Sequence, residues 1–192
     1  MTNINEAAFS NCNNLRGVYY SGTYDQFWHE LYPAIGNNNG PLLIAMNYYA
    51  DATNCLYDST GFVYSPLSDN TYSLVGYNGR SAEITTPTTY NGKDVTRIYT
   101  CAFANRKNLT NITISSGMSF IDVGAFQDCS NLVSIDIPNT IIGIDYYVFA
   151  NCSSLASIKL PEGLTTIESA LFENCSSLAT IRIPSTVTKI SD

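Results

Sequence analysis

The stretch 121–189 reads IDVGAFQDCSNLVSIDIPNTIIG, then IDYYVFANCSSLASIKLPEGLTT, then IESALFENCSSLATIRIPSTVTK, three units of equal length with the same residue types in the same order. Each unit has 23 residues and begins with an isoleucine, at 121, 144 and 167. A period in this range is typical of a solenoid, in which one short unit cannot bury its apolar face alone and stacks on its neighbours. The sequence therefore predicts a β-rich solenoid in which equivalent residues form columns.

The same pattern extends back to Ile98 and forward to Ile190, and it predicts the elements of each unit. The Leu-x-x-Ile-x-Ile alternation has a period of two, which suits a strand with alternate residues buried. The part from the first isoleucine to the cysteine is too short for a long helix, so a second short strand and a helical turn are expected there. Asn or Asp precedes each cysteine position, where its side chain can close a turn by binding nearby backbone groups. These residues are Asn105, Asp128, Asn151 and Asn174.

The six cysteines do not have the spacing of a disulfide framework. Four of them, Cys12, Cys129, Cys152 and Cys175, hold the same position of a repeat unit, where a small buried apolar group is wanted. A uniform column cannot pair off neatly, and cysteine is among the residues most often buried. Free buried thiols are therefore expected in preference to disulfides.

Residues 51–97 carry β signals, and we expect them to cap the array that follows. A turn at 58–61 separates two apolar segments, and Asn78-Gly79 predicts a hairpin between 72–77 and 80–84, because both residues tolerate positive φ. The segment 84–87 is similar to the strand and proline of a later unit, with 90–94 as an inserted turn. A cap is needed because the end of a solenoid exposes an apolar rung and strand edges.

Residues 1–50 are expected to hold the end of a preceding array and a closing element. The segment 4–20 matches the body of a repeat, and Thr23 with Gln26 has the spacing of a capping box at the start of a helix that Pro33 ends. The expected domains are therefore 1–50, the cap 51–97, and four repeats in 98–192. Both ends look cut from a longer chain, and no signal peptide is visible.

Composition excludes several classes of partner. The chain has 192 residues, 45% of them hydrophobic and 13% charged, with a formal net charge of -7. Nucleic acids and anionic membranes select clustered Lys and Arg, which this sequence lacks. The longest apolar run, 41–46, is far too short to cross a bilayer.

The repeat Ile-x-x-x-Ala-Phe-x-x-Cys-x-x-Leu-x-x-Ile-x-Ile-Pro closely resembles the BspA-like class of leucine-rich repeats. Residues 98–120 depart from it at Arg106, in the cysteine position, and at Ser115, in the proline position. Segments around 18–42 and 72–95 look like the modules that close and open such arrays. The resemblance implies a leucine-rich-repeat fold and a bacterial secreted or surface-attached protein, often connected with adhesion.

Few residues offer catalytic chemistry, so no catalytic residue, metal ligand or cofactor is assigned. The single histidine, His29, lies in the expected helix and cannot form a metal site unaided. Asp122, Asp145 and Glu168 share one repeat position, but one carboxylate per rung is a poor ligand set for calcium. Solvated surface charge is the expected state of this acidic row.

The candidate site is the outer face of the main strands, because leucine-rich-repeat folds commonly bind partners across this extended face. We expect a non-enzymatic, surface or secreted module that binds a host or other cell-surface protein. A structural spacer in a larger surface protein and a carbohydrate-binding module are the alternatives, and the ligand and oligomeric state stay open. The candidate residues are Asn111, Thr113, Ser134, Asp136, Ser157, Lys159, Thr180 and Arg182.

Overall fold

The computed structural model describes residues 56–191. The chain divides after Cys55 into two compact units, and the account below concerns the second, Leu56–Asp192. The predictions for residues 1–50, a repeat-like segment and a closing element with a helix, lie outside the described residues, as do His29 and Cys12.

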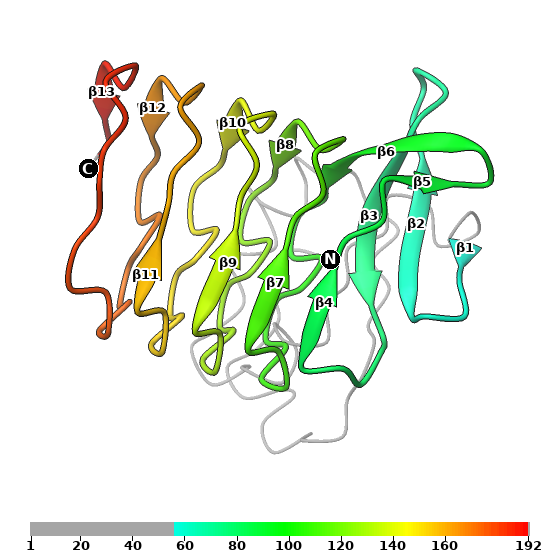
Figure 1. Cartoon of the computed structure of the whole chain (residues 1–192), viewed down its shortest axis with the longest axis horizontal. Helices are drawn as coiled ribbons and strands as arrows, with labels where there is room; N and C mark the ends of the chain where they lie inside the picture. Colours follow the sequence, from blue (N-terminus) through cyan, green and yellow to red (C-terminus); the bar gives the residue numbers. More distant parts are fainter. Residues whose placement is uncertain (1–55, 192) are drawn as a thin grey trace, which may run out of the picture. The chain divides into compact units, whose positions relative to one another are not determined.

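Two ribbons of short parallel strands run along the solenoid, one on each side of a shared interior (Figure 1). The first ribbon contains, side by side, β4 (Glu83–Thr85), β7 (Asn111–Thr113), β9 (Ser134–Asp136) and β11 (Ser157–Ile158). The second ribbon contains β6 (Lys93–Ile98), β8 (Phe120–Ile121) and β10 (Gly143–Ile144), followed by the separate pair β12 (Thr166–Ile167) and β13 (Lys189–Ile190). The strand register pairs Ile112 with Ile135 and Ile135 with Ile158, so neighbouring rungs are one sequence period apart. The predicted solenoid is confirmed.

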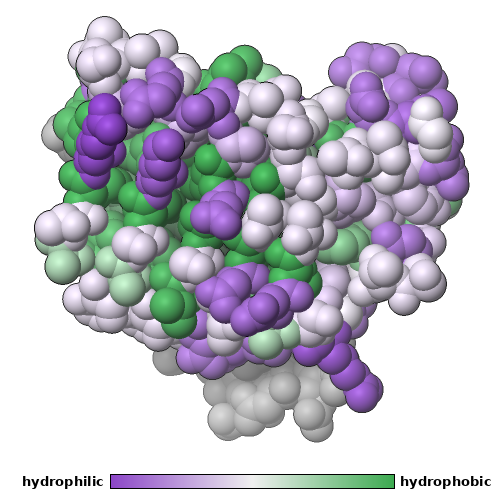
Figure 2. Space-filling model, viewed as in Figure 1, coloured by the Kyte–Doolittle hydropathy of each residue, from purple (hydrophilic) through white to green (hydrophobic). Residues whose placement is uncertain are grey.

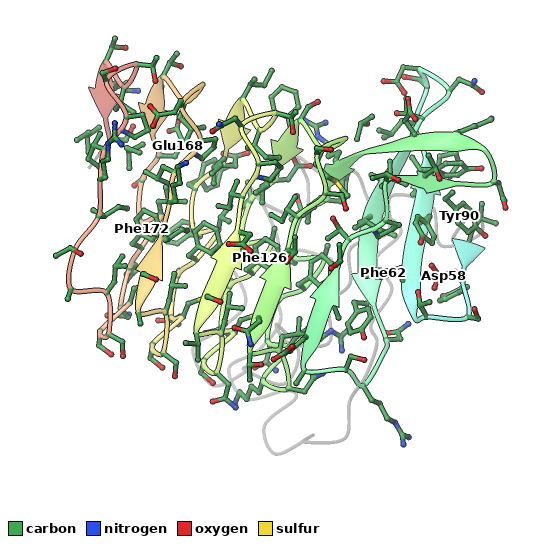
Figure 3. The ribbon with its side chains drawn as sticks, viewed as in Figure 1. Asp58, Phe62, Tyr90, Phe126, Glu168 and Phe172 are labelled. Carbon is green, nitrogen blue, oxygen red and sulfur yellow. The ribbon has the colours of Figure 1, made fainter. Side chains whose placement is uncertain are left out.

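A column of phenylalanine rings fills the interior between the ribbons. The ring centroids of Phe103 and Phe126 are 5.2 Å apart, those of Phe126 and Phe149 5.7 Å, and those of Phe149 and Phe172 5.6 Å. The ring planes of the last two pairs are almost parallel, with interplanar angles of 2° and 6°. Figure 3 shows the labelled Phe126 and Phe172 in this interior. Equal sequence spacing has therefore become direct stacking, which gives one continuous core.

The described members of the cysteine column, Cys129, Cys152 and Cys175, are buried free thiols, as the sequence predicts. Each thiol donates to the carbonyl oxygen of the phenylalanine one rung earlier: Cys129 to Phe103 at 3.0 Å, and Cys152 to Phe126 at 3.2 Å. Burial raises the pKa of the Cys129 thiol to about 12, so the neutral thiol is the stable form. The small side chain thus fills the core and satisfies a backbone carbonyl at once.

Consecutive turns, rather than a helical turn, follow the second strand of each unit, and no helix occurs among residues 56–191. The backbone amides alternate in direction: Phe103 N donates to Ala125 O of the next rung, whereas Ala104 N donates to Cys101 O within its own turn. In an α-helix every interior amide would bond a carbonyl of the same helix, so an amide that bonds the next rung is incompatible with a helix here. Two left-handed residues per unit allow the alternation, and these are Cys101, Asn105, Gly124, Asp128, Tyr147, Asn151, Ala170 and Asn174.

The column of Asn and Asp side chains is a hydrogen-bonded ladder as well as a set of turn formers. Asn151 has a φ of 61° and donates from Nδ2 to Asp128 Oδ1 at 2.8 Å. Its own Oδ1 accepts a hydrogen bond from Asn174 Nδ2 at 2.8 Å. Asn is one of the few residues that adopt the left-handed region at low cost.

Replacing Asn151 by alanine should therefore lower the free energy of unfolding by about 1–2 kcal/mol, since it adds backbone strain and removes two side-chain bonds. Urea denaturation followed by circular dichroism measures the change. Asn151→Gly is the matched control, because it removes the same bonds but tolerates the positive φ. Equal losses in the two variants would show that backbone strain has no part in the effect.

Antiparallel strands begin the described unit and extend the second ribbon. β1 (Leu56–Tyr57) pairs with β2 (Phe62–Pro66), which pairs with β3 (Tyr72–Tyr77), and β3 then runs parallel to β6. The predicted turn at 58–61 is present, where Asp58 Oδ1 accepts from the amides of Thr60 and Gly61, each at 2.9 Å. The inserted segment forms β5 (Thr89–Tyr90), which pairs antiparallel with the start of β6.

The predicted Asn78-Gly79 hairpin is wrong. Residues 80–84 do not pair with β3; β4 instead joins β7 in the other ribbon, with Ile84 opposite Ile112. Close packing explains Gly79, because a Cβ there would overlap the Tyr77 ring. The same segment passes close to Gly61: Asn78 N donates to Gly61 O at 2.7 Å, and a Cβ on Gly61 would lie 2.5 Å from Gly79 N. Asn78-Gly79 therefore serves a close backbone approach while the chain crosses from one ribbon to the other.

The two departures in 98–120 have local explanations. Arg106, in the cysteine position, is half-buried, and its Nη2 donates to Asn78 Oδ1 at 3.4 Å. Ser115, in the proline position, keeps a backbone amide that donates to Thr86 Oγ1 at 2.9 Å, and its hydroxyl bonds Thr86 O. Proline has no amide hydrogen and could not make the first of these bonds. This rung is thus adapted to the neighbouring segment that contains β4.

Candidate binding surfaces

The sequence-predicted site residues lie on the outer side of the first ribbon. The register places Asn111, Ser134 and Ser157 side by side, and Thr113 beside Asp136. A parallel bridge between Lys159 and Arg182 extends the second of these columns by two further rungs. We call this surface the strand face, and it comprises Glu83, Thr85, Asn111, Thr113, Ser134, Asp136, Ser157, Lys159, Thr180 and Arg182.

Hydrogen bonds between side chains link the first three residues of one column. Asn111 Nδ2 donates to Glu83 Oε1 at 3.0 Å, and Ser134 Oγ donates to Asn111 Oδ1 at 2.7 Å. Asn111 and Ser134 are half-buried, whereas Ser157 and Thr180 are exposed. The polar groups of Asn111 and Ser134 therefore bind their own neighbours and offer less to a partner than the rest of the strand face.

The other column is exposed and changes charge along the solenoid. Thr113 and Asp136 are followed by Lys159 and Arg182, and all four are exposed. The Arg182 side chain is 82% exposed, and its Nη2 lies 3.8 Å from Glu162 Oε1, a loose pair that contributes little to stability. In Figure 2, hydrophilic groups stand out from a hydrophobic band that follows the strands of this ribbon. Lys159 and Arg182 therefore form a cationic patch at one end of the strand face.

A groove lies on the outer side of the second ribbon, around an exposed aromatic ring. The register places Arg97, Phe120 and Gly143 in one column. The Arg97 guanidinium carbon is 5.0 Å from the centroid of the Phe120 ring, and a Cβ on Gly143 would lie 2.7 Å from that ring. The ring is therefore held between a cation and a residue without a side chain, and Phe120 stays 38% exposed. We call this region the Phe120 groove.

The acidic row of Asp122, Asp145 and Glu168 lines the same groove, which has a volume of about 260 Å³. Arg97 Nε is 3.1 Å from Asp122 Oδ1, and the Asp122 side chain is only 14% exposed. Burial raises the pKa of Asp122 to about 6, although Arg97 acts in the opposite direction. Burial also raises the pKa of Asp145, and the neighbouring Glu168 adds to the effect. Solvated surface charge is thus the wrong description of Asp122, because the groove walls shield it.

The described part of the chain contains no group of three or more His, Cys, Asp or Glu residues positioned to hold a metal ion. Within residues 56–191, no helix is long and apolar enough to cross a membrane.

Arg97 and Phe120 were not among the residues selected from the sequence. They occupy the position just before the first isoleucine of a unit, which holds Gly143, Thr166 and Lys189 in the other units. An aromatic residue at an outward position that elsewhere holds glycine or polar residues is the signal that could have identified the groove.

A sequence model described as BspA type leucine rich repeat region matches residues 80–192 as 6 copies. The chain belongs to this family. The match begins before β4 and covers all the rungs described above, and it confirms the resemblance seen in the sequence. BspA-type repeats form a scaffold, and their side chains rather than their fold determine what they bind.

Solved structures support the assignment. The T. pallidum leucine rich repeat protein is 27% identical, with a TM-score of 0.67 over 70% of this chain and 63% of that one. A leucine-rich repeat protein from Bacteroides ovatus is 28% identical, with a TM-score of 0.62 over 75% of this chain and 38% of that one. A leucine rich cell surface protein from Faecalibacterium prausnitzii, 23% identical, shows the same fold with a TM-score of 0.56 over 74% of this chain and 52% of that one.

This BspA-type chain thus spans less than two thirds of the length of each of these three relatives. A comparison with curated proteins finds no significant match.

Proposed function

We infer that this chain is a non-enzymatic module of a secreted or surface-attached bacterial protein, and that it binds a protein partner through the strand face. The observation that carries the proposal is the exposed column of Thr113, Asp136, Lys159 and Arg182, which the parallel register of the first ribbon aligns. The location outside the cell and the role in adhesion rest on the family resemblance.

The charge order of the strand face sets the chemistry of the partner. Lys159 and Arg182 stand on neighbouring rungs with exposed side chains, whereas Asp136 precedes them by one rung. A complementary partner carries an acidic patch opposite the two cations, because matched potentials raise the association rate and fix the register of a complex. Arg182 suits this role because a guanidinium group can form a bidentate pair of hydrogen bonds with a carboxylate.

The double variant Lys159→Glu with Arg182→Glu tests the proposal. In biolayer interferometry against a panel of host matrix proteins, wild type should bind at least one protein saturably, and the variant should lose about tenfold or more in affinity. Binding should also weaken as salt is raised. The matched control is Lys93→Glu with Lys107→Glu, which makes the same charge change at exposed lysines outside the strand face.

Two other results would contradict the proposal. Equal loss in both double variants would mean that net charge, rather than the strand face, governs binding. If the wild type binds no protein of the panel, the result would favour a structural spacer that holds other parts of a larger surface protein away from the cell.

A glycan is the second candidate ligand, and the Phe120 groove favours it. An exposed ring beside carboxylates and an arginine offers both an apolar face and hydrogen-bonding groups. Glycan-array binding that is lost in Phe120→Ala but kept in Lys159→Glu with Arg182→Glu would support this ligand. Glycan binding that is kept in Phe120→Ala but lost in Lys159→Glu with Arg182→Glu would rule out the Phe120 groove as the glycan site.

A further inference from the structure

A second depression adjoins the Phe120 groove, and the Phe120 ring and the Arg97 side chain line both of them. It has a volume of about 280 Å³, and we call it the Thr96 depression. Thr96 supplies a hydroxyl group to its wall, and the other residues that line it are Leu67, Asp69 and Ser119. The two cavities thus meet at an aromatic ring that is 38% exposed, so one extended ligand can contact both.

The charge of the two cavities is predominantly negative. A single cation, Arg97, lines them, and its Nε already lies 3.1 Å from Asp122 Oδ1. The carboxylates that line them are those of Asp69, Asp122, Asp145 and Glu168. One guanidinium cannot balance four carboxylates, so the electrostatic potential here favours a cationic ligand over an anionic one.

Asp145 and Glu168 are the carboxylates best placed to meet such a ligand. Both are half-buried, and neither forms an ion pair within residues 56–191. Asp145 Oδ1 accepts a hydrogen bond from the Tyr146 amide at 3.0 Å, and Glu168 Oε2 accepts one from the Ser191 hydroxyl at 3.4 Å. Their negative charges are therefore stabilised only by neutral donors, and a cation in the groove would provide the missing opposite charge.

The surroundings of the Phe120 ring favour a sugar over a peptide. The strand that carries the ring, β8, is paired with β6 on one side and with β10 on the other. A peptide backbone therefore finds no free strand edge beside the ring. A sugar needs no such edge, because its C–H groups pack on an aromatic ring and its hydroxyls bond carboxylates and hydroxyl groups, such as those of Asp145 and Ser119.

We propose that the Phe120 groove and the Thr96 depression bind a glycan whose sugars carry free, protonated amino groups. The inference rests on the second candidate function, a glycan in the Phe120 groove, and it is independent of the strand face. An ammonium group beside Asp145 and Glu168 forms charge-assisted hydrogen bonds, which are about twice as strong as neutral ones. An acidic sugar would instead place like charges side by side, which is unfavourable.

Tetrasaccharides that differ only in their amino groups test the proposal. The probes are the β-1,4-linked glucosamine tetramer, the N-acetylglucosamine tetramer and cellotetraose, each titrated into the full chain by isothermal calorimetry in slightly acidic buffer. The glucosamine tetramer should bind about tenfold or more tightly than the other two, which have the same linkage without the charge. Added salt should weaken its binding more than theirs.

Two variants separate the contribution of the charge from that of the ring. Glu168→Gln should weaken binding of the glucosamine tetramer about fivefold and leave cellotetraose unchanged, because it removes the charge and keeps a hydrogen-bonding group. Phe120→Ala should weaken binding of all three tetrasaccharides, since each loses the aromatic contact. Glu173→Gln is the matched control, because Glu173 is exposed and lines neither cavity, and its affinities should equal those of wild type.

Several outcomes would overturn the proposal, and they differ in what else they remove. If cellotetraose binds as tightly as the glucosamine tetramer and Phe120→Ala weakens both, the groove binds glycans without selecting the amino group. If no tetrasaccharide binds, the glycan candidate fails as well, whereas the strand face is unaffected. If tetralysine binds as tightly as the glucosamine tetramer, and Phe120→Ala weakens neither, the cavities attract cations without recognising a sugar.

Discussion

Replacing Phe126 by alanine is expected to lower the free energy of unfolding by about 3–5 kcal/mol, which is the usual cost of removing a buried aromatic ring. Phe126 is completely buried, and its ring stacks on Phe103 at 5.2 Å and on Phe149 at 5.7 Å. The truncation therefore leaves a cavity in the middle of the column and removes two ring contacts at once. Because proteins are stable by only about 5–15 kcal/mol, the variant should be near the limit of folding. Urea denaturation followed by circular dichroism measures the loss.

Phe172→Ala is the internal comparison for this prediction. Phe172 has the same position one period from Phe149, but it is only partly buried and stacks on one ring, at 5.6 Å. We expect about half the loss seen for Phe126→Ala, since less apolar surface leaves contact with the protein. Equal losses at the two sites would mean that the ring column does not act as a graded, rung-by-rung core. Phe126→Leu should recover part of the stability, because it refills most of the cavity.

The 23-residue period predicts the features that arise when residues at the same repeat position lie side by side in neighbouring rungs. The ring column, the free thiols and the second column of the strand face all follow from residues one period apart lying side by side. The period contains less information about how the backbone turns between strands. Phe103 N bonds the next rung whereas Ala104 N bonds its own turn, and this alternation excludes the helical turn that the segment length suggested. Asn78-Gly79 was misread because a Cβ on Gly79 would overlap the Tyr77 ring and because Asn78 N donates to the distant Gly61 O, and neither demand is visible in the dipeptide.

Of the two candidate surfaces, the sequence predicts the strand face but not the Phe120 groove. The strand face follows from alternation within a strand, because outward and inward positions are fixed relative to each other. The Phe120 groove does not, since the exposure of its ring depends on Arg97 above it and on the missing side chain of Gly143 beside it. Likewise, the acidic row is visible in the sequence, but the burial of Asp122 results from packing between rungs. Lateral packing of outward side chains has no periodic signature.

Replacing Asp122 by asparagine is expected to change the pH dependence of stability. Burial raises the pKa of Asp122 in the folded chain to about 6 from its ordinary value of 3.8. The folded state therefore binds more protons than the unfolded state between these values, and stability falls as pH rises through this window. The full effect is about 3 kcal/mol for a shift of this size. Above pH 6 the wild-type chain bears the cost of a buried charge that Arg97, 3.1 Å away, only partly offsets.

Asp122→Asn should accordingly gain about 2 kcal/mol relative to wild type when the pH is raised from 4.5 to 7.5, because its side chain cannot ionise. Urea denaturation at a series of pH values gives this difference directly, and contributions from other titrating groups such as Asp145 largely cancel between the two proteins. Asp136→Asn, which removes an exposed carboxylate from the strand face, is the matched control for the loss of one acidic group. A relative stability of Asp122→Asn that stays constant with pH would mean that Arg97 fully offsets burial, and one that falls as pH rises would mean that Arg97 dominates the environment of Asp122. In that case the acidic row would be a stabilising charge network, and the Phe120 groove would be held in shape by ionised carboxylates at neutral pH.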